Sequence, residues 1–343
     1  MQTSFDRFRD IAKKAVRIAA DIAVQHSQEK HQTGKEDGTD VTVFDIACQI
    51  KIVELIREEF KDANIMAEET KIPKEMLPDL EKILNMEVGE NSLDTGELDT
   101  KAEGVWVIDP IDGTSGFIEG LSYSHCVAYM TRKGVVLAAA IASPEIKGRT
   151  TPNGTLVYAT KDGGAWMEDL KGFFKERIVL RAGMEKKYEP NKEELKEKNT
   201  LRDNIQKISG KKIACERGQC KVLSICLGAS DVAFSYRNKV QSTWDHTCGA
   251  LIIKEAGGVV NDVNGEKLVF PVDREMGENK GVVYAKNKDS MEAFLLAFKE
   301  CCPECFSPKE PSCVPGDSQE CVGGEMAERS KPSSGSKRRK LAK

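Results

Sequence analysis

The sequence lacks any apolar run of about 18 residues, the length that a membrane-spanning helix requires. It also lacks an apolar segment close to its first residue, where the charged residues Asp6, Arg7 and Arg9 stand instead, so we expect no secretory signal. The net charge is only -4, which gives no basic surface for binding nucleic acid polymers. No internal repeat is present. The sequence therefore predicts neither a membrane-spanning protein nor a protein that binds nucleic acid polymers.

What the sequence contains is ordinary for such a protein. Its 343 residues are 40% hydrophobic and 31% charged, and a chain of this length buries a real core, as one large domain or two smaller ones. The cysteine content is high at eleven, but six of these occur singly before residue 300, mostly beside apolar residues. We interpret them as reduced core thiols and expect a cytoplasmic protein.

In the first half, apolar residues recur at helical spacing in residues 4–27 and 45–60, which we expect to be helices. Residues 71–103 are acidic and contain two prolines, so we expect an irregular excursion there. Short apolar runs with turn signals predict strands. These strands are expected at residues 65–67, 105–108, 124–131, 135–142, 155–159 and 164–166.

The second half begins with a highly charged segment, residues 183–212, that resembles a surface helical insertion. An alternating α/β pattern follows, with a helix that we expect to stop at Gly257 and Gly258. The organisation predicts subdomains at residues 1–185 and 186–300, and a disordered Cys-rich and basic tail at 301–343. The expected strands are 213–215, 231–236, 281–285 and one near 259; the expected helices are 221–227, 245–255 and 290–299.

One stretch carries most of the chemical information: Asp109-Pro-Ile-Asp112-Gly-Thr114. It follows the predicted strand at 105–108, so we expect both carboxylates at the C-terminal end of that strand, where α/β proteins place their functional groups. Hard cations such as Mg²⁺ prefer carboxylate oxygens and take further ligands from substrate phosphates. The stretch therefore predicts a metal-dependent phosphate site.

Three further acidic positions adjoin predicted elements, and each has an ordinary interpretation of its own. Asp45 with Thr42 forms a capping-box pattern at a helix start. Glu68-Glu69 alone is typical of a solvated pair. Asp245 alone is typical of the first turn of a helix. Only the ordered set, with the hexapeptide in its middle, predicts a metal site.

This set resembles the three-part metal signature of the lithium-sensitive, magnesium-dependent phosphomonoesterases, the inositol monophosphatase-like superfamily. The matching segments are Glu68-Glu69, Asp109–Thr114 and Trp244-Asp245, and the resemblance extends to residues 255–258. It covers most of residues 5–300. It implies lithium sensitivity and a layered α-β-α-β-α sugar-phosphatase fold, of the α+β or α/β class.

The resemblance also implies how the carboxylates would be used. Glu68, Asp109 and the backbone carbonyl of Ile111 would hold a first Mg²⁺ ion. Asp109, Asp112 and Asp245 would hold a second. A third, weaker ion would lie near Glu68. Asp109 would bridge two ions, since a carboxylate has two oxygens to share.

The catalytic residues implied by the resemblance are Asp45 and Thr114, which would orient and deprotonate a water molecule. The backbone N–H groups of Gly113, Thr114 and Ser115 would face the phosphate at a helix start. We expect direct in-line attack of water on phosphorus, without a covalent phosphoenzyme. His246, the neighbour of a predicted ligand, is expected to be structural rather than a ligand.

Within the superfamily, the chain is more similar to the 3'(2'),5'-bisphosphate nucleotidases than to the inositol monophosphatases. Residues 39–49 and Asp112-Gly-Thr-Ser-Gly-Phe117 resemble nucleotidase segments, and Gly218-Gln-Cys-Lys221 resembles their Ser-Gln-x-Lys. The resemblance implies that Lys221 binds the second phosphate of the substrate; the ordinary alternative is a surface lysine.

Two departures weaken the match at the second phosphate. Gly218 replaces the serine of the nucleotidases, and Ser235 replaces an arginine, although Arg237 lies two residues further on. We expect hydrolysis of 3'-phosphoadenosine 5'-phosphate to AMP and phosphate, with Lys221 and Arg237 as substrate-binding residues. An inositol monophosphatase, or a broader sugar-phosphate phosphatase, is the alternative.

Two other classes stay open at this point. A haloacid-dehalogenase-type phosphatase also has an Asp-Gly-Thr signature, but one residue separates its aspartates, whereas Pro110 and Ile111 intervene here. A non-catalytic metal- or nucleotide-binding protein would need a damaged catalytic pair, yet Asp45 and Thr114 are both present. The expected partner is a small phosphorylated nucleotide, and the expected assembly is a monomer or homodimer.

The tail carries two side hypotheses. Cys302, Cys305, Cys313 and Cys321 could bind zinc, although their spacing is irregular. Lys337-Arg-Arg-Lys340 could direct nuclear import; a solvated charged end is the plainer interpretation.

Overall fold

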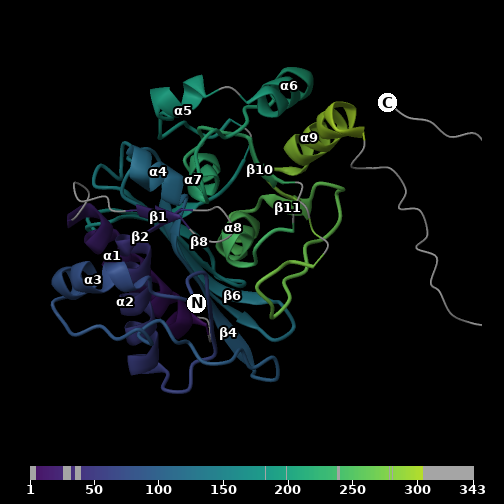
Figure 1. Cartoon of the computed structure of the whole chain (residues 1–343). Coiled ribbons are helices and arrows are strands. Elements are labelled where there is room, and N and C mark those ends of the chain that lie inside the picture. Colours follow the sequence, from purple (N-terminus) through teal and green to yellow (C-terminus); the bar gives the residue numbers. More distant parts are fainter. Residues whose placement is uncertain are drawn as a thin grey trace, which may run out of the picture. The chain divides into compact units, whose positions relative to one another are not determined.

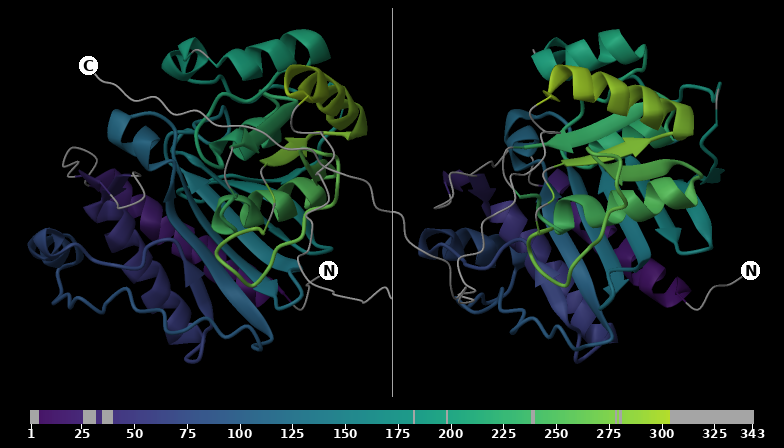
Figure 2. Two further views of the ribbon diagram at one scale, coloured as in Figure 1. Left: turned by 45° about the vertical axis from the view of Figure 1, so that its right-hand side comes forward. Right: turned by 90° about the vertical axis from the view of Figure 1, so that its right-hand side faces the viewer.

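The computed structural model describes residues 5–25, 32–34, 40–181, 183–197, 199–237, 240–277, 279 and 281–303. All of them belong to one compact unit, residues 1–306. Within this unit helices and sheets stack in the order α-β-α-β-α (Figure 1), and the layers are separated most clearly when the molecule is turned (Figure 2). The layered fold implied by the sequence resemblance is thus present.

The first layer consists of α1 (Asp6–Gln25) and α2 (Val43–Glu59). Small side chains line the buried face of α1, where Ala12, Ala15 and Ala19 are fully buried and let the helix lie close to its neighbours. The expected irregular excursion is partly wrong, because η1 (Lys74–Met76) and α3 (Leu77–Leu84) form within it. Pro78 stands in the first turn of α3, where no N–H is needed.

The second layer is a seven-stranded sheet whose strands lie in sequence order, β3 to β9. Only β3 and β4 pair in parallel; the other neighbours are antiparallel. All positions of β6 are buried, because helices cover both faces of the sheet. The strands are β3 (Ile65–Ala67), β4 (Gly104–Asp112), β5 (Ser124–Thr131), β6 (Val136–Ser143), β7 (Thr155–Thr160), β8 (Gly164–Asp169) and β9 (Lys175–Ile178).

The remaining layers come from the second half of the chain. Helices α7 (Cys220–Cys226) and α8 (Trp244–Glu255) form the middle layer. An antiparallel sheet in the order β10-β12-β11 follows, and α6 and α9 cover its far side. These elements are β10 (Val232–Tyr236), β11 (Val259–Asp262), β12 (Gly281–Ala285), α6 (Thr200–Ser209) and α9 (Lys288–Cys301). Short elements complete the fold: β1 (Gln32–Gly34), β2 (Asp40–Thr42), α4 (Thr114–Glu119) and α5 (Lys192–Lys196).

Three sequence predictions for the second half need correction. Residues 213–215 form no strand, only a single bridge between Ile213 and Val232. The charged segment is not merely a surface insertion, because Ile205 of α6 is fully buried in the cluster that joins α6 and α9 to the second sheet. Cys302 is buried in that same hydrophobic cluster, so its thiol does not fit the zinc site suggested for the tail. Cys305, Cys313, Cys321 and Lys337–Lys340 lie outside the described residues.

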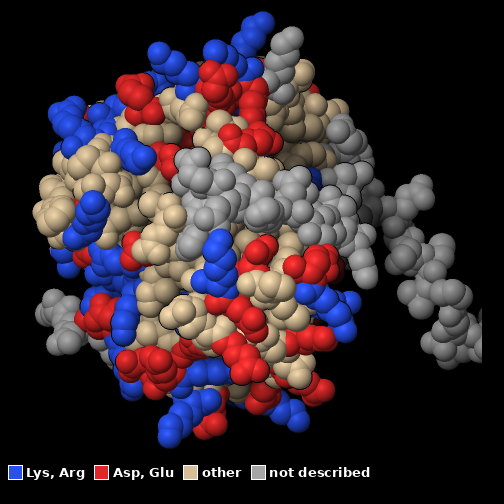
Figure 3. Space-filling model, turned by 60° about the vertical axis from the view of Figure 1, so that its left-hand side comes forward, with Lys and Arg blue, Asp and Glu red and all other residues tan. Residues whose placement is uncertain are grey.

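On the face shown in Figure 3, lysine and arginine side chains are interspersed with acidic ones. No helix in the described part of the chain combines the length and apolar character needed to cross a bilayer.

Candidate active site

Three carboxylates from two elements converge at one point of the structure. Asp109 and Asp112 come from β4 and Asp245 from the first turn of α8, and one oxygen of each lies within 4.8 Å of the others. Asp109 is only 1% exposed, and its Oδ1 atom has no hydrogen-bond partner. A buried, unpartnered carboxylate oxygen is costly unless a cation compensates it. This donor set fits a hard divalent cation such as Mg²⁺.

The electrostatics of the cluster support the same interpretation. Burial raises the pKa of Asp109 well above its usual range, and the negative charge of Glu68 raises it further. Burial and the charge of Asp245 raise the pKa of Asp112 to about 7, while Lys221 and a backbone N–H oppose the rise. The carboxylates repel one another in the protein alone, so a bound cation would stabilise their charged forms.

A β-bulge brings the two aspartates of β4 to the same side. In a regular strand, residues three apart point to opposite faces, but the register of β4 against β5 shifts between Asp109 and Asp112. Pro110, which has no N–H to give, stands in the bulge, and its carbonyl accepts a hydrogen bond from His125 Nδ1 at 2.6 Å. Burial lowers the pKa of His125 to about 4, so this imidazole is neutral. The apolar run at residues 105–108 predicts a strand that ends before Asp109, whereas β4 continues to Asp112.

Glu68 joins the cluster from the end of β3. Its backbone N–H continues the parallel pairing by donating to Ile108 O at 3.1 Å, and its negative charge raises the pKa of Asp109. Its neighbour Glu69 is only 6% exposed. The Gln49 side chain binds the backbone of Glu69 through two hydrogen bonds. Gln49 Oε1 accepts from the Glu69 N–H at 2.9 Å, and Gln49 Nε2 donates to the Glu69 carbonyl at 2.7 Å. An ordinary solvated pair is therefore wrong for these two residues.

Asp45 performs two tasks with its two oxygens. Its Oδ2 atom accepts from the backbone N–H of Thr42 at 2.8 Å and from the Thr42 hydroxyl at 2.6 Å, which completes the capping box of α2. Its Oδ1 atom accepts from the Thr114 hydroxyl at 3.1 Å. The same hydroxyl lies 3.1 Å from the carbonyl of Ile111. The capping interpretation is confirmed, and it leaves one oxygen directed toward the site.

The turn after β4 presents backbone N–H groups. Gly113 has a φ of 93°, a left-handed conformation that favours glycine, and it begins the short helix α4. The N–H groups of Gly113, Thr114 and Ser115 stand at this helix start, although α4 has only six residues. The Ser115 hydroxyl accepts a hydrogen bond from Arg217 Nη1 at 3.0 Å.

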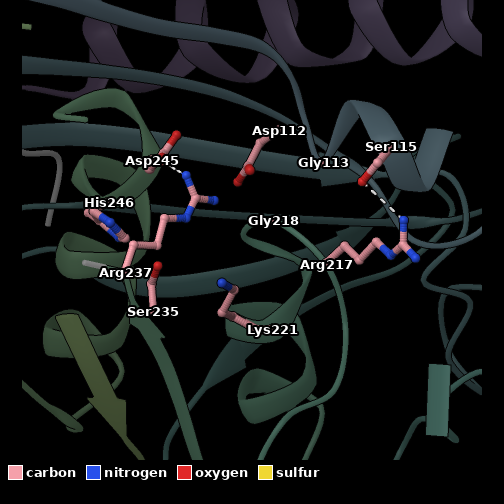
Figure 4. A pocket seen from close by; sticks show the side chains of 10 residues that line it. All are labelled: Asp112, Gly113, Ser115, Arg217, Gly218, Lys221, Ser235, Arg237, Asp245 and His246. Atoms are coloured by element: carbon pink, nitrogen blue, oxygen red, sulfur yellow. Dashed lines mark hydrogen bonds and ion pairs between the residues drawn. The ribbon is translucent and has the colours of Figure 1, made fainter. Parts of the chain in front are cut away.

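A cavity of about 350 Å³ opens beside the carboxylates (Figure 4). Two cations line the cavity with Asp112 and Asp245: Lys221 from α7, and Arg237, whose guanidinium lies beside Asp245, 3.9 Å from its Oδ2 atom. Burial lowers the pKa of Lys221, and Asp112 opposes that change. Ten residues line the cavity: Asp112, Gly113, Ser115, Arg217, Gly218, Lys221, Ser235, Arg237, Asp245 and His246.

His246 lines this cavity without being directed to the carboxylates. Its Nδ1 atom is hydrogen-bonded to the Tyr284 hydroxyl at 2.8 Å, and its Nε2 atom to Gln241 Oε1 at 3.1 Å. Gln241 also accepts from the Ser235 hydroxyl at 3.0 Å. Both ring nitrogens of His246 are therefore occupied by neighbouring side chains, as expected of a structural histidine.

Two residues that sequence reasoning missed organise the cavity. Gln219 donates its backbone N–H to Asp112 Oδ2, and its side chain spans to the Trp244 carbonyl at 3.2 Å and the Gly249 N–H at 2.7 Å. Arg217 pairs with Glu119 and Glu197 while reaching Ser115. The Ser-Gln-x-Lys resemblance drew attention to the segment but not to these contacts.

Gly218 has a structural reason to differ from serine. Its φ is +53°, and a Cβ at this position would lie 2.5 Å from Asp112 O and 2.6 Å from Asp112 Oδ1. Glycine therefore allows the turn to approach a predicted metal ligand closely.

Comparisons with known proteins agree with this geometry. The family model described as inositol monophosphatase family matches residues 4–301. A 3'(2'),5'-bisphosphate nucleotidase of Schizosaccharomyces pombe is 26% identical over 327 residues, covering 82% of this chain and 92% of the relative. Another, of Oryza sativa, is 28% identical over 339 residues, covering 85% and 94%.

Solved structures show the same fold. The IMPase of Thermotoga maritima is similar with a TM-score of 0.60 at 22% identity, covering 87% of this chain and 99% of that one. An IMPase/NADP phosphatase complexed with Mg²⁺ and phosphate has a TM-score of 0.57 at 14% identity, covering 86% and 96%. The predicted layered fold is confirmed by these likenesses.

Proposed function

Because the chain belongs to the inositol monophosphatase family, we propose that it is a metal-dependent phosphomonoesterase that hydrolyses 3'-phosphoadenosine 5'-phosphate to AMP and phosphate. The observation that carries the proposal is the convergence of Asp109, Asp112 and Asp245 beside a cavity that also holds Lys221 and Arg237. The relatives named 3'(2'),5'-bisphosphate nucleotidase support the substrate class.

The residues present fit Mg²⁺ at the positions expected from the sequence. Glu68, Asp109 and the Ile111 carbonyl would hold one ion, and Asp109, Asp112 and Asp245 a second; a third would lie near Glu68. When bound, such ions supply the positive charge that acidifies a water molecule and stabilises the leaving oxygen. The Oδ1 atom of Asp109 is buried without a hydrogen-bond partner, and a bound ion would compensate its charge.

Asp45 and Thr114 would handle the proton of the attacking water. The Thr114 hydroxyl is held between Asp45 Oδ1 and the Ile111 carbonyl, both at 3.1 Å. The Thr114 hydroxyl donates its hydrogen to Asp45, and its oxygen can at the same time accept a hydrogen bond from the water molecule. This makes the water a better nucleophile. The N–H groups of Gly113, Thr114 and Ser115 would bind the phosphoryl oxygens, aligning phosphorus for in-line attack.

Lys221 and Arg237 would bind the second phosphate of the substrate. No hydrogen bond joins the Lys221 ammonium to another described residue, and Arg237 meets Asp245 only at 3.9 Å. Both cations therefore remain available to an anion in the cavity. A substrate with two phosphates can reach the carboxylate cluster with one and these cations with the other.

The deciding experiment compares phosphate release from 3'-phosphoadenosine 5'-phosphate, inositol 1-phosphate and fructose 1,6-bisphosphate, with and without Mg²⁺ and Li⁺. We expect the nucleotide to be turned over fastest, only with Mg²⁺, and less with Li⁺. Faster turnover of the inositol phosphate would overturn the nucleotide assignment. The Asp109→Asn and Asp245→Asn variants should release no phosphate while staying folded; wild-type rates in both would overturn the metal site.

The proposal also extends to the cellular location of the protein, its subdomains and its oligomeric state. Six of the eight described cysteines are buried, as expected of the reduced core thiols of a cytoplasmic protein. Nuclear import through residues 337–340, subdomains at 1–185 and 186–300, and a monomeric or homodimeric state are parts of the proposal that fractionation, limited proteolysis and sedimentation would test.

A further inference from the structure

We propose that Arg274 is a positioning residue that fixes the separation of the two sides of the metal centre; the inference rests on the proposed function for the identity of that centre. Arg274 lies in the loop between β11 and β12. Its Nη1 atom donates to the carbonyl of Ala67 at 2.7 Å and its Nη2 atom to the carbonyl of Glu68 at 2.7 Å. The guanidinium thus holds the backbone of a predicted ligand at the end of β3.

The same guanidinium contacts the other side of the centre. It lies over the indole ring of Trp244, 4.6 Å from the ring centroid, and Trp244 directly precedes the predicted ligand Asp245. Cation–π contacts of this kind are worth most where water is excluded, and Trp244 is 8% exposed. One side chain therefore joins the segment of Glu68 to the segment of Asp245.

The loop that carries Arg274 is itself fastened to the start of α8. The Thr243 N–H donates to Arg274 O at 2.9 Å, and the Thr243 hydroxyl donates to Asp273 O at 2.7 Å. The Met276 N–H donates to Gln241 O at 2.9 Å. The main chain of this loop is thus fixed to the start of α8, where Asp245 lies. The Arg274 side chain then fixes the end of β3, where Glu68 lies, relative to the start of α8. A planar fork with two parallel donors suits this task, and a lysine ammonium does not reproduce it.

Positioning and charge act in opposite directions here, which makes the proposal testable. The positive charge of Arg274 near Glu68 disfavours a cation in the site. If charge were its only effect, removing it would tighten ion binding and lysine would behave like arginine. If Arg274 positions the ligands, removing the fork weakens ion binding, and lysine fails to rescue it.

The test is direct Mn²⁺ binding to the full chain without substrate, measured by electron paramagnetic resonance and by competition with Mg²⁺. We expect Arg274→Lys and Arg274→Met to weaken binding by about 10- to 100-fold, the range for residues that orient ligands. The matched control is Arg149→Met, which removes an exposed arginine paired with Glu185 at 2.8 Å and should leave binding unchanged.

Kinetics supply a second readout. The Mg²⁺ concentration for half-maximal rate should rise in Arg274→Lys, while kcat at saturating Mg²⁺ stays within a few-fold of wild type. Wild-type Mn²⁺ affinity in Arg274→Lys would overturn the proposal, as would tighter binding in a folded Arg274→Met. The wild-type protein could also fail to hydrolyse nucleotides while these variants still lose Mn²⁺ affinity. That result would refute only the proposed substrate and would leave the positioning role of Arg274 standing.

Discussion

The Thr114 hydroxyl lies 3.1 Å from Asp45 Oδ1, while the other oxygen of the same carboxylate caps α2. Asp45 is fully buried, so its orientation is set by these contacts rather than by solvent. The helix start and the group that would activate water are therefore parts of one hydrogen-bonded unit.

This arrangement predicts separable effects for two substitutions. Asp45→Asn removes the acceptor that polarises Thr114, so we expect kcat to fall by about 10²- to 10⁴-fold. Thr42→Ala removes the cap but leaves the contact between Asp45 and Thr114, so it should lower the free energy of unfolding by about 1 kcal/mol with a small effect on kcat. Steady-state kinetics and urea unfolding of both variants provide the measurement. Equal kcat losses would contradict this separation, because they would show that the Thr42 hydroxyl is needed to position Asp45 for its role.

Lys221 should matter only for substrates with two phosphates. We expect Lys221→Gln to raise KM for 3'-phosphoadenosine 5'-phosphate by about 10- to 100-fold, since a charge-assisted hydrogen bond is lost. KM for adenosine 3'-monophosphate should not change. Lys147→Gln, at an exposed lysine outside the cavity, is the control. A parallel rise for both substrates would contradict the role in second-phosphate binding.

Gly218→Ser restores the residue of the nucleotidases that the segment resembles, yet the structure predicts harm. A side chain in the left-handed conformation costs about 1–2 kcal/mol, and the new Cβ would press on Asp112. We expect a lower free energy of unfolding together with weaker Mn²⁺ binding. Gly89→Ala, where a Cβ meets nothing within 4 Å, should change neither. A fully active, equally stable Gly218→Ser variant would refute this reasoning.

Glu216 predicts a pH dependence of stability that is independent of the metal centre. It is 5% exposed, and burial raises its pKa from 4.5 to about 7, with the charge of Glu194 adding to the rise. Below pH 4.5 the carboxyl is protonated in both states and contributes nothing. As pH rises toward about 7, the unfolded chain ionises more readily, so the free energy of unfolding falls by up to about 3 kcal/mol.

The measurement compares urea unfolding of wild type and Glu216→Gln between pH 4 and 8. The glutamine variant should become relatively more stable as pH rises. Glu189→Gln, at an exposed position, should track the wild type. A constant difference between wild type and Glu216→Gln over this range would show that Glu216 titrates normally.

Local sequence patterns predicted most helices and strands, because the spacing of apolar residues that favours each element lies within the element itself. Helical spacing located α1 and α2, and the apolar runs located β5 and β6 almost to the residue. The bulge in β4 escaped prediction because it is a feature of the pairing between β4 and β5, which the sequence of β4 alone does not contain. The packing of α6 escaped because the apolar face around Ile205 is narrow and its partner, α9, lies far along the sequence.

The candidate site was likewise predicted from the sequence only in part. The motifs pointed to Asp45, Glu68, Asp109, Asp112 and Asp245. The structure brings Asp109, Asp112 and Asp245 together beside one cavity and joins Asp45 to Thr114. Arg217, Gln219 and Arg274 carry no local signal, because their contacts exist only after distant segments meet. Sequence motifs therefore identify candidate metal ligands more readily than the residues that contact these candidates from distant segments.

The division of the carboxylates between β4 and α8 also sets an order of assembly. During synthesis the first half of the chain emerges early, and it carries Asp109 and Asp112 but not Asp245. The nascent site is therefore incomplete until α8 docks on the first sheet. A cation that requires all three carboxylates would bind last, and its arrival would mark a finished fold rather than nucleate one.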